Sequence, residues 1–500
     1  MQNRTIYIKG TAICLVWALL AACNKKLDDI TPHNVLFEEQ EFSTPAGFTK
    51  TTIANYNSIT TNSASVGYDM NWFNLCEFRG NNIRTVDVTS FSNSTAAQDI
   101  DAFNFTNSSS KDFGRSDGFW KASYKALLGI NTVLKHVKDD ETDNTILQAK
   151  AENLFLRAVV FFNLVRLYGR PYYQSPSTNL GLPLILAPIT SSGEKPSRAT
   201  VEETYQQIIT DLNEAVKNFR QTKVNSFASK YAAYALLSRV YLYMSGPYTQ
   251  PNTQNAQLAA RYADSVIANG GYSLLQGVDY TAYYNNSNQA NAETIWAVNH
   301  DATVSSIPVI LYQPTGQYAG SPSYVTGQAK PSPDLLGLMN AGDLRKNFYV
   351  TDKYPGNNTD TVSCRKYMYK YTSVYTCNAP IHYLRLAEMY LNRAEARVKS
   401  GDNGGALADV NVIRLRAGLT SVSGLSAQVL FDEILKQRRI ELAFEGHNSF
   451  DYFRNGLSMV RNYGSFNSPA ITVNPTDPKV VLRISDDILF ENGNIIQNNQ

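Results

Sequence analysis

Two polar segments of the sequence contain aromatic residues of the kind that bind sugars. The first segment, residues 68–82, offers Tyr68, Trp72, Arg79, Asn81 and Asn82. Aromatic rings can stack on the apolar C–H faces of a sugar, while guanidinium and amide groups hydrogen bond to its hydroxyl rim. The same rings could instead anchor their loop against neighbouring helices, and the sequence leaves both interpretations open.

The second aromatic segment, residues 311–328, lies on a stretch rich in glycine and proline. It offers Tyr312, Tyr318 and Tyr324 for the same stacking role. Two further aromatic residues are interpreted differently, since Trp296 alternates with small and apolar neighbours and Trp120 sits on a helical stripe. We expect both tryptophans in the core.

A charged segment near the end of the chain could be read as catalytic. Arg438, Glu441, Glu445, His447 and Asp451 lie close together in the sequence. Two glutamates one helical turn apart would not easily flank a glycosidic bond at the separations that hydrolysis needs. We therefore expect a structural network of ion pairs. The sequence also lacks a nucleophile elbow, a zinc-protease motif, a phosphate-binding loop and a dinucleotide fingerprint, so we predict that the protein is not an enzyme.

Metal, cofactor and disulfide signals are weak. The loop from Asp352 to Asp360 could coordinate Ca²⁺, but it lacks the pattern of an EF-hand, and we expect neither a bound metal nor a cofactor. Cys364 and Cys377 could form a disulfide in an oxidising compartment. Their geometry cannot be deduced from sequence, so this pairing stays open.

The N-terminus has the features of a secretory signal. Arg4 and Lys9 precede an apolar run over residues 12–22, which is too short to span a bilayer comfortably. Leu20-Ala21-Ala22-Cys23 resembles a bacterial lipobox, in which the cysteine thiol receives a diacylglycerol. We predict a signal peptide over residues 1–22, lipidation at Cys23, a tether over 23–35 and a folded domain over 36–500.

A net charge of only +2 gives no reason to expect nucleic acid as a partner.

Helical periodicity dominates the rest of the chain. Apolar residues recur at helical spacing in 145–168, and Thr200 with Glu203 forms a capping box. Small residues alternate with tyrosine and leucine in two helical pairs, as in tetratricopeptide repeats.

Long segments rich in Asn, Ser, Thr and Gly separate these helices, at 62–116, 284–380 and 456–500. Within them we expect short strands at 294–298 and 364–371. The predicted fold is mainly α, with helical pairs, long irregular loops and a few short β-strands. The other expected helices are 48–60, 117–138, 200–219, 228–244 with 255–268, 382–399 with 403–416, and 427–445.

Six segments in a fixed order make the chain resemble SusD/RagB outer-membrane lipoproteins over nearly its whole mature length. They include AENLFLRAVVFFNLVRLYG at 151–169, SKYAAYALLSRVYLYMSG at 229–246 and ILKQRRIELAFEGHNSFDYFRNG at 434–456. The chain departs from the family pattern at Gln437 and Asn448, where Glu and Arg are common. The resemblance divides the domain into an N-terminal SusD-like part, 36–220, and a C-terminal RagB/SusD part, 221–500.

The resemblance also implies a function. Proteins of this family sit on the cell surface, bind glycan segments or in some branches peptides, and cover the mouth of a SusC-type TonB-dependent transporter. We therefore expect non-catalytic capture of a glycan at the outer membrane, with delivery to such a transporter. The same architecture binding peptides is the alternative. A surface glycosidase or a purely structural scaffold agrees less well with the residues described above.

Overall fold

The computed structural model describes residues 38–60, 67–85, 94–106, 114–189, 191, 193–282, 291–299, 316–317, 324–325, 329–353, 360–364, 380–463 and 470–498. The chain divides into two compact units, residues 1–48 and 49–500. The first unit contains the short helix α3 (Glu38–Glu41). Directly after it, the ring of Phe42 packs edge-to-face on that of Phe48, with ring centroids 5.0 Å apart. Helix α4 (Pro45–Ser58) spans the division at residue 48.

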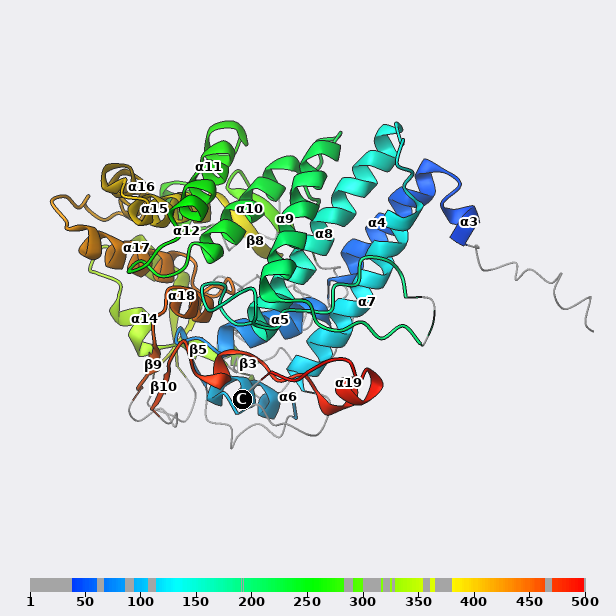
Figure 1. Cartoon of the computed structure of the whole chain (residues 1–500). Coiled ribbons are helices and arrows are strands. Elements are labelled where there is room, and N and C mark those ends of the chain that lie inside the picture. Colours follow the sequence, from blue (N-terminus) through cyan, green and yellow to red (C-terminus); the bar gives the residue numbers. More distant parts are fainter. Residues whose placement is uncertain are drawn as a thin grey trace, which may run out of the picture. The chain divides into compact units, whose positions relative to one another are not determined.

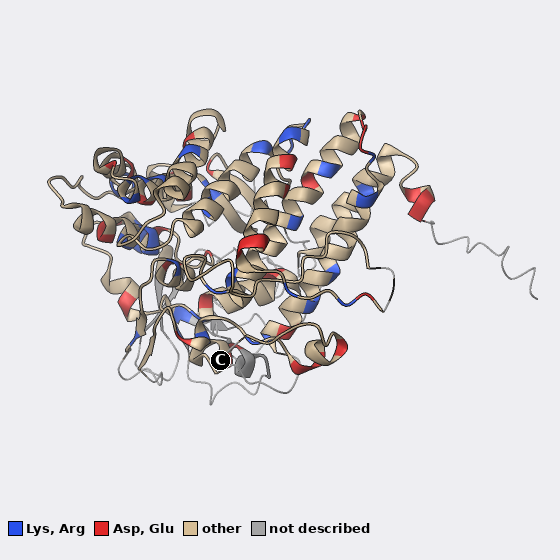
Figure 2. Cartoon of the chain, in the orientation of Figure 1, with Lys and Arg blue, Asp and Glu red and all other residues tan. Residues whose placement is uncertain are grey.

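Helical pairs form the body of the second unit. Neighbouring helices α7 to α11 lie side by side in Figure 1, and α15 packs against both α11 and α16. Basic and acidic residues are interspersed along these helices (Figure 2), in keeping with the low net charge. The longer helices are α5 (Tyr68–Phe78), α6 (Ser94–Asn104), α7 (Arg115–His136), α8 (Asn144–Tyr168), α9 (Val201–Asn218), α10 (Lys230–Met244), α11 (Thr253–Asn269), α15 (Leu386–Lys399), α16 (Asn403–Arg416) and α17 (Ala427–Glu441).

Helix α8 forms the centre of the core. The Asp143 side chain caps it by accepting hydrogen bonds from the backbone amides of Thr145 and Ile146. From Ala151 onward every residue of the helix is buried, because α7 and α9 pack directly against it. Helix α9 starts with the predicted capping box, in which the Thr200 and Glu203 side chains each accept from the other residue's backbone amide.

Short elements connect and cover these helices. The structure describes the helices α12 (Gly277–Thr281), α14 (Pro333–Gly337), α18 (Asn448–Arg454) and α19 (Asp486–Glu491), and the 3₁₀ helices η2 (Leu344–Phe348) and η4 (Pro478–Val480). The described strands form antiparallel two-stranded sheets: β1 (Ile83–Thr85) with β5 (Ala329–Pro331), β2 (Thr294–Val298) with β8 (Ile381–Arg385), β3 (Gly316–Gln317) with β4 (Tyr324–Val325), β6 (Tyr349–Lys353) with β7 (Asp360–Cys364), and β9 (Met459–Arg461) with β10 (Ile471–Val473).

The structure confirms most of the expected helices and the strand at 294–298. Trp296 is fully buried against Phe155, with ring centroids 5.0 Å apart, and Trp120 is also buried, as expected. Cys364 ends strand β7, whereas Cys377 and residues 365–371 lie outside the described residues. Most of the possible Ca²⁺ loop at 352–360 lies outside them too. None of the described helices is long and apolar enough to cross a membrane.

Three expected boundaries were wrong. Residues 62–116 were expected to be irregular but contain α5 and α6. Helix α5 could not be recognised in the sequence because it is buried on every side and so has no polar stripe. Residues 382–385 belong to strand β8, where pairing with β2 replaces the helix expected from residue 382. Helix α17 ends at Glu441 rather than 445, since Phe444 and Gly446 both have positive φ angles.

Candidate functional site

Helix α5 and the turn that follows it contain the first predicted set of ligand contacts. Tyr68, Trp72, Arg79, Asn81 and Asn82 are between 1% and 3% exposed. The Tyr68 hydroxyl accepts a hydrogen bond of 2.8 Å from Asn163 on α8. The structure therefore brings these residues together, but inside the protein, where direct contact with a ligand stays a prediction.

The Trp72 ring is packed between other parts of the chain. It lies 5.3 Å from the Tyr383 ring, centroid to centroid, and the Arg166 guanidinium lies 5.9 Å from its centroid. A β-carbon added at Gly446 would lie only 2.7 Å from the Trp72 ring, so the backbone approaches the indole closely. These contacts favour the alternative interpretation for Trp72, that it anchors its segment against the neighbouring helices.

Asn81 and Asn82 join the turn after α5 to α17 and α18. The Asn81 backbone amide donates to Asn448 Oδ1 at 2.6 Å, and its side-chain amide donates to the Tyr452 hydroxyl at 3.2 Å. The Arg439 guanidinium donates to Asn82 Oδ1 at 2.9 Å, to the Asn81 carbonyl at 3.0 Å and to the Tyr452 hydroxyl at 3.2 Å. This network fixes Arg439 and Tyr452 in place.

A pocket of about 190 Å³ lies beside this network and is the strongest candidate for a binding site. Arg439 and Tyr452 line it, so the buried turn and the pocket share two residues. The other lining residues come from α14, α17, α18 and the segments next to them: Leu338, Leu435, Lys436, Asn448, Asp451 and Leu457. Its lining thus combines apolar side chains with fixed hydrogen-bond donors.

The donors of this pocket have hydrogens left for a ligand. A guanidinium carries five N–H donors, and the three contacts of Arg439 use three of them. The Tyr452 hydroxyl accepts from both Asn81 and Arg439, which leaves its own hydrogen to donate. Three leucine side chains offer an apolar surface beside these donors. Such a lining suits a small polar molecule with an apolar face, of which a sugar ring is one.

Most of this pocket has no signal in the sequence. Arg439 and Asp451 belong to the charged segment, and Asn448 is a departure from the family pattern. Leu338 is the residue that follows α14, about a hundred residues before Lys436 in the sequence. Only the tertiary fold brings these two residues to the same pocket. The second predicted segment cannot be compared with the pocket. Tyr312 and Tyr318 lie outside the described residues, and for Tyr324 only the backbone is described, in β4.

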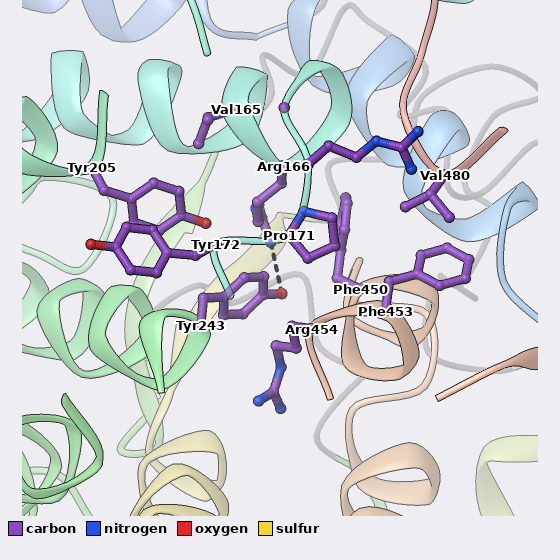
Figure 3. Close-up of a pocket in the computed structure, with 12 residues that line it drawn as sticks. Val165, Arg166, Pro171, Tyr172, Tyr205, Tyr243, Phe450, Phe453, Arg454 and Val480 are labelled. Atoms are coloured by element: carbon purple, nitrogen blue, oxygen red, sulfur yellow. Dashed lines mark hydrogen bonds between the residues drawn. The ribbon is translucent and has the colours of Figure 1, made fainter. Parts of the chain in front are cut away.

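A second, smaller pocket surrounds the side chain of Arg166 (Figure 3). Its volume of about 20 Å³ is enough for about one water molecule. The guanidinium carbon of Arg166 lies 4.4 Å from the centroid of Phe162 and 4.7 Å from that of Phe450. Arg166 also donates to the Tyr243 hydroxyl at 3.3 Å, drawn as the dashed line in Figure 3. We interpret this pocket as a packing feature of the core.

The glutamates that could have formed a catalytic pair are both engaged by arginines. Arg385 binds Glu445 and Glu441, each at 2.7 Å, and Arg416 binds Glu441 at 2.5 Å. All of these side chains are nearly fully buried. Tyr280 donates a hydrogen bond of 2.8 Å to Glu441, and burial together with this carboxylate raises the pKa of the Tyr280 hydroxyl. The pair therefore serves as part of a buried ion network.

His447 shares this structural environment. The ring is buried beside Arg438, 3.5 Å from a guanidinium nitrogen. Burial is the main reason that the pKa of His447 lies well below its usual value, and the positive charges of Arg239 and Arg438 lower this pKa further. The ring is therefore neutral at pH 7. Within the described part of the chain, no group of histidine, cysteine and acidic residues has the arrangement of a metal site.

The described part of the chain thus combines stacked helical pairs with a pocket lined by apolar side chains and hydrogen-bond donors. A family model described as "Starch-binding associating with outer membrane" matches residues 49–242, and the "SusD family" model matches residues 337–489. The chain belongs to the SusD family, whose members are binding proteins associated with the outer membrane.

Individual relatives support the same family. A SusD-like protein of Bacteroides ovatus is 26% identical over 387 residues, which cover 69% of this chain and 67% of that protein. A SusD superfamily protein from Bacteroides thetaiotaomicron superposes with a TM-score of 0.75 at 26% identity, over 91% of this chain and 100% of that one. A SusD-like carbohydrate binding protein from Bacteroides vulgatus shares the fold with a TM-score of 0.73 at 20% identity, over 90% and 97% of the two chains.

Proposed function

We propose that this protein captures glycan at the surface of the outer membrane and delivers it to a SusC-type TonB-dependent transporter without altering it chemically. The observation that carries the proposal is the match of residues 49–242 to a family described as starch-binding and associated with the outer membrane. A solved protein of the same fold is described as carbohydrate binding. The buried, ion-paired state of Glu441 and Glu445 agrees with a role that involves no hydrolysis.

The proposed ligand contacts come from two places. The pocket beside Arg439 would hold one sugar unit, with leucine side chains against its apolar face and the Tyr452 hydroxyl as a hydrogen-bond donor. Tyr312, Tyr318 and Tyr324 stay the proposed stacking residues for the glycan, as expected from the sequence. Each such ring buries enough apolar surface to contribute a few kcal/mol before binding costs, at about 25 cal/mol per Å². The combination suits affinities in the micromolar to millimolar range, which permit both capture and release.

Calorimetry of the purified chain tests this proposal. We expect heat from at least one member of a panel of polysaccharides and no heat from a panel of peptides. Binding of peptides alone would replace glycan by peptide as the cargo. A chain that binds neither class would contradict the proposal.

Two substitutions test the proposed contacts. Tyr452→Phe removes the proposed donor to the ligand and also the acceptor of Asn81 and Arg439. It should therefore weaken glycan binding at least about threefold to tenfold, the usual value of one hydrogen bond. Tyr318→Ala should also weaken binding and leave the melting temperature nearly unchanged. The matched control is Tyr248→Phe, outside the pocket, where the ring stacks on Phe431 at 4.6 Å. If affinity is the same in all three variants, neither proposed contact is correct.

Anchoring of the protein depends on Cys23 in this proposal. Two or three acyl chains, at about 0.8 kcal/mol per buried CH₂, hold a protein on its membrane. We expect Cys23→Ala to remove the lipid and to release the protein from the membrane fraction of cells. Mass spectrometry of the native N-terminal peptide should detect the diacylglycerol adduct at Cys23. An unmodified cysteine, or a variant that stays on the membrane, would contradict lipid anchoring at this residue.

A further inference from the structure

Two buried arginines, Arg79 and Arg461, lie on the same aromatic ring. The guanidinium carbon of Arg79 lies 4.5 Å from the centroid of Phe105, and that of Arg461 lies 5.6 Å from it. Arg461 also stacks over Phe103, at 3.7 Å. The two side chains come from the turn after α5 and from strand β9, almost four hundred residues apart in the sequence, and are 2% and 1% exposed.

Backbone carbonyls satisfy only part of each guanidinium. Arg79 Nη2 donates to the carbonyls of Lys479 and Val480, at 2.6 and 2.9 Å, and Arg461 Nη2 donates to the carbonyl of Phe103. Arg79 Nη1 and both Nε and Nη1 of Arg461 are buried without a hydrogen-bond partner. Buried donors in this state cost free energy until something accepts their hydrogens.

Most of the other buried arginines face a carboxylate. Arg115 and Arg157, for example, face Asp99 and Asp211 at 2.8 and 2.7 Å. Arg166 and Arg198 do not, but their guanidinium nitrogens donate to hydroxyl, amide and carbonyl oxygens. In the described part of the chain, no carboxylate contacts Arg79 or Arg461. Burial lowers the pKa of each to about 10, and the neighbouring charge of Arg461 also lowers the pKa of Arg79. Both side chains are still cationic at pH 7, and a water molecule could accept their hydrogens but could not balance their charge.

We propose that the Arg79–Arg461 pair is the binding site of a small anion, such as sulfate, phosphate or chloride, which accepts the guanidinium hydrogens that no protein group uses. Guanidinium groups suit oxyanions because their N–H donors form a planar fork. The same chemistry is carried by sulfate esters and carboxylates of acidic sugars. Arg79 then contributes to the fold through a bound ion, in place of the direct ligand contact expected from the sequence.

Thermal unfolding of the purified chain at constant ionic strength tests this proposal. Millimolar sodium sulfate should raise the melting temperature in a saturable manner, because a ligand that binds only the folded state stabilises it. Arg79→Gln and Arg461→Gln should each abolish that shift. Arg220→Gln, a change of an exposed arginine, should retain it.

The source of the anion is tested in the same unfolding experiment with a sulfated disaccharide and its unsulfated form. Stabilisation by free sulfate identifies an inorganic ion, and stabilisation by the sulfated sugar alone identifies a group carried by the glycan.

Crystals of the unaltered protein soaked in sodium bromide supply a test that does not depend on the variants folding. An anomalous peak in contact with Arg79 Nη1 or Arg461 Nη1 is the expected result. The proposal is overturned if no peak appears there and neither sulfate nor the sulfated sugar gives a saturable shift. An equal shift in the wild type and in both glutamine variants would also overturn it, since that pattern reflects a general salt effect.

Discussion

Replacing Arg385 with alanine is expected to lower the free energy of unfolding by about 3–5 kcal/mol, the usual loss when one partner of a buried ion pair is removed. Arg385 ends strand β8 and binds three glutamates, Glu293 at 2.9 Å and Glu441 and Glu445 at 2.7 Å each. It also donates to the Glu441 carbonyl at 2.6 Å. Without this side chain, buried negative charge would lose the cation that joins β8 to the end of α17.

Urea denaturation of the variant and the wild type measures this loss. The matched control is Arg220→Ala, because this arginine is exposed and a surface change of this kind usually stays within about 0.5 kcal/mol. A variant too unstable to purify would agree with the prediction. A loss below about 1 kcal/mol for Arg385→Ala would mean that the network contributes little, and that the helical packing alone holds this part of the fold.

Replacing Trp72 with alanine is the second change with a large expected effect. We expect a loss of about 3–5 kcal/mol in the free energy of unfolding, as for other buried large aromatic residues. The ring is 3% exposed and packs against Tyr383, while the backbone of Gly446 lies directly beside it. Deletion of the indole would therefore leave a cavity between α5, β8 and the end of α17.

Two readouts together separate a core role for Trp72 from a binding role. If the ring is core, urea denaturation shows the loss, and Trp72→Phe recovers part of it by filling some of the cavity. If the ring stacks on a ligand, stability stays near that of the wild type and glycan affinity falls. That second pattern would contradict the packing described here and would restore Trp72 as a stacking residue.

The helical framework could largely be predicted because its signals are local. The spacing of Ala151, Phe155, Ala158 and Phe162 is enough to identify α8, and Thr200 with Glu203 identifies the start of α9. Helix α5 was missed for a physical reason. It buries polar residues such as Asn71 and Asn74 alongside Trp72, so its sequence has neither a polar face nor an apolar stripe.

The candidate pocket depends on contacts between distant parts of the chain. The hydrogen bond from Arg439 to Asn82 joins residues 357 positions apart, and no periodicity or motif encodes such a pairing. Residue types alone did indicate that Asn81 and Asn82 have a polar role. They could not indicate that these side chains orient Arg439 and Tyr452 toward the pocket instead of contacting solvent themselves.

Recovery of a bound polysaccharide after incubation with the protein tests the central claim most directly. The polysaccharide that gives the strongest calorimetric signal is incubated with the purified chain, eluted and sized by chromatography beside an untreated sample. A capture protein should retain the polymer and return it at its original length. A polymer that is not retained, or one that is eluted as shorter fragments, would contradict the account.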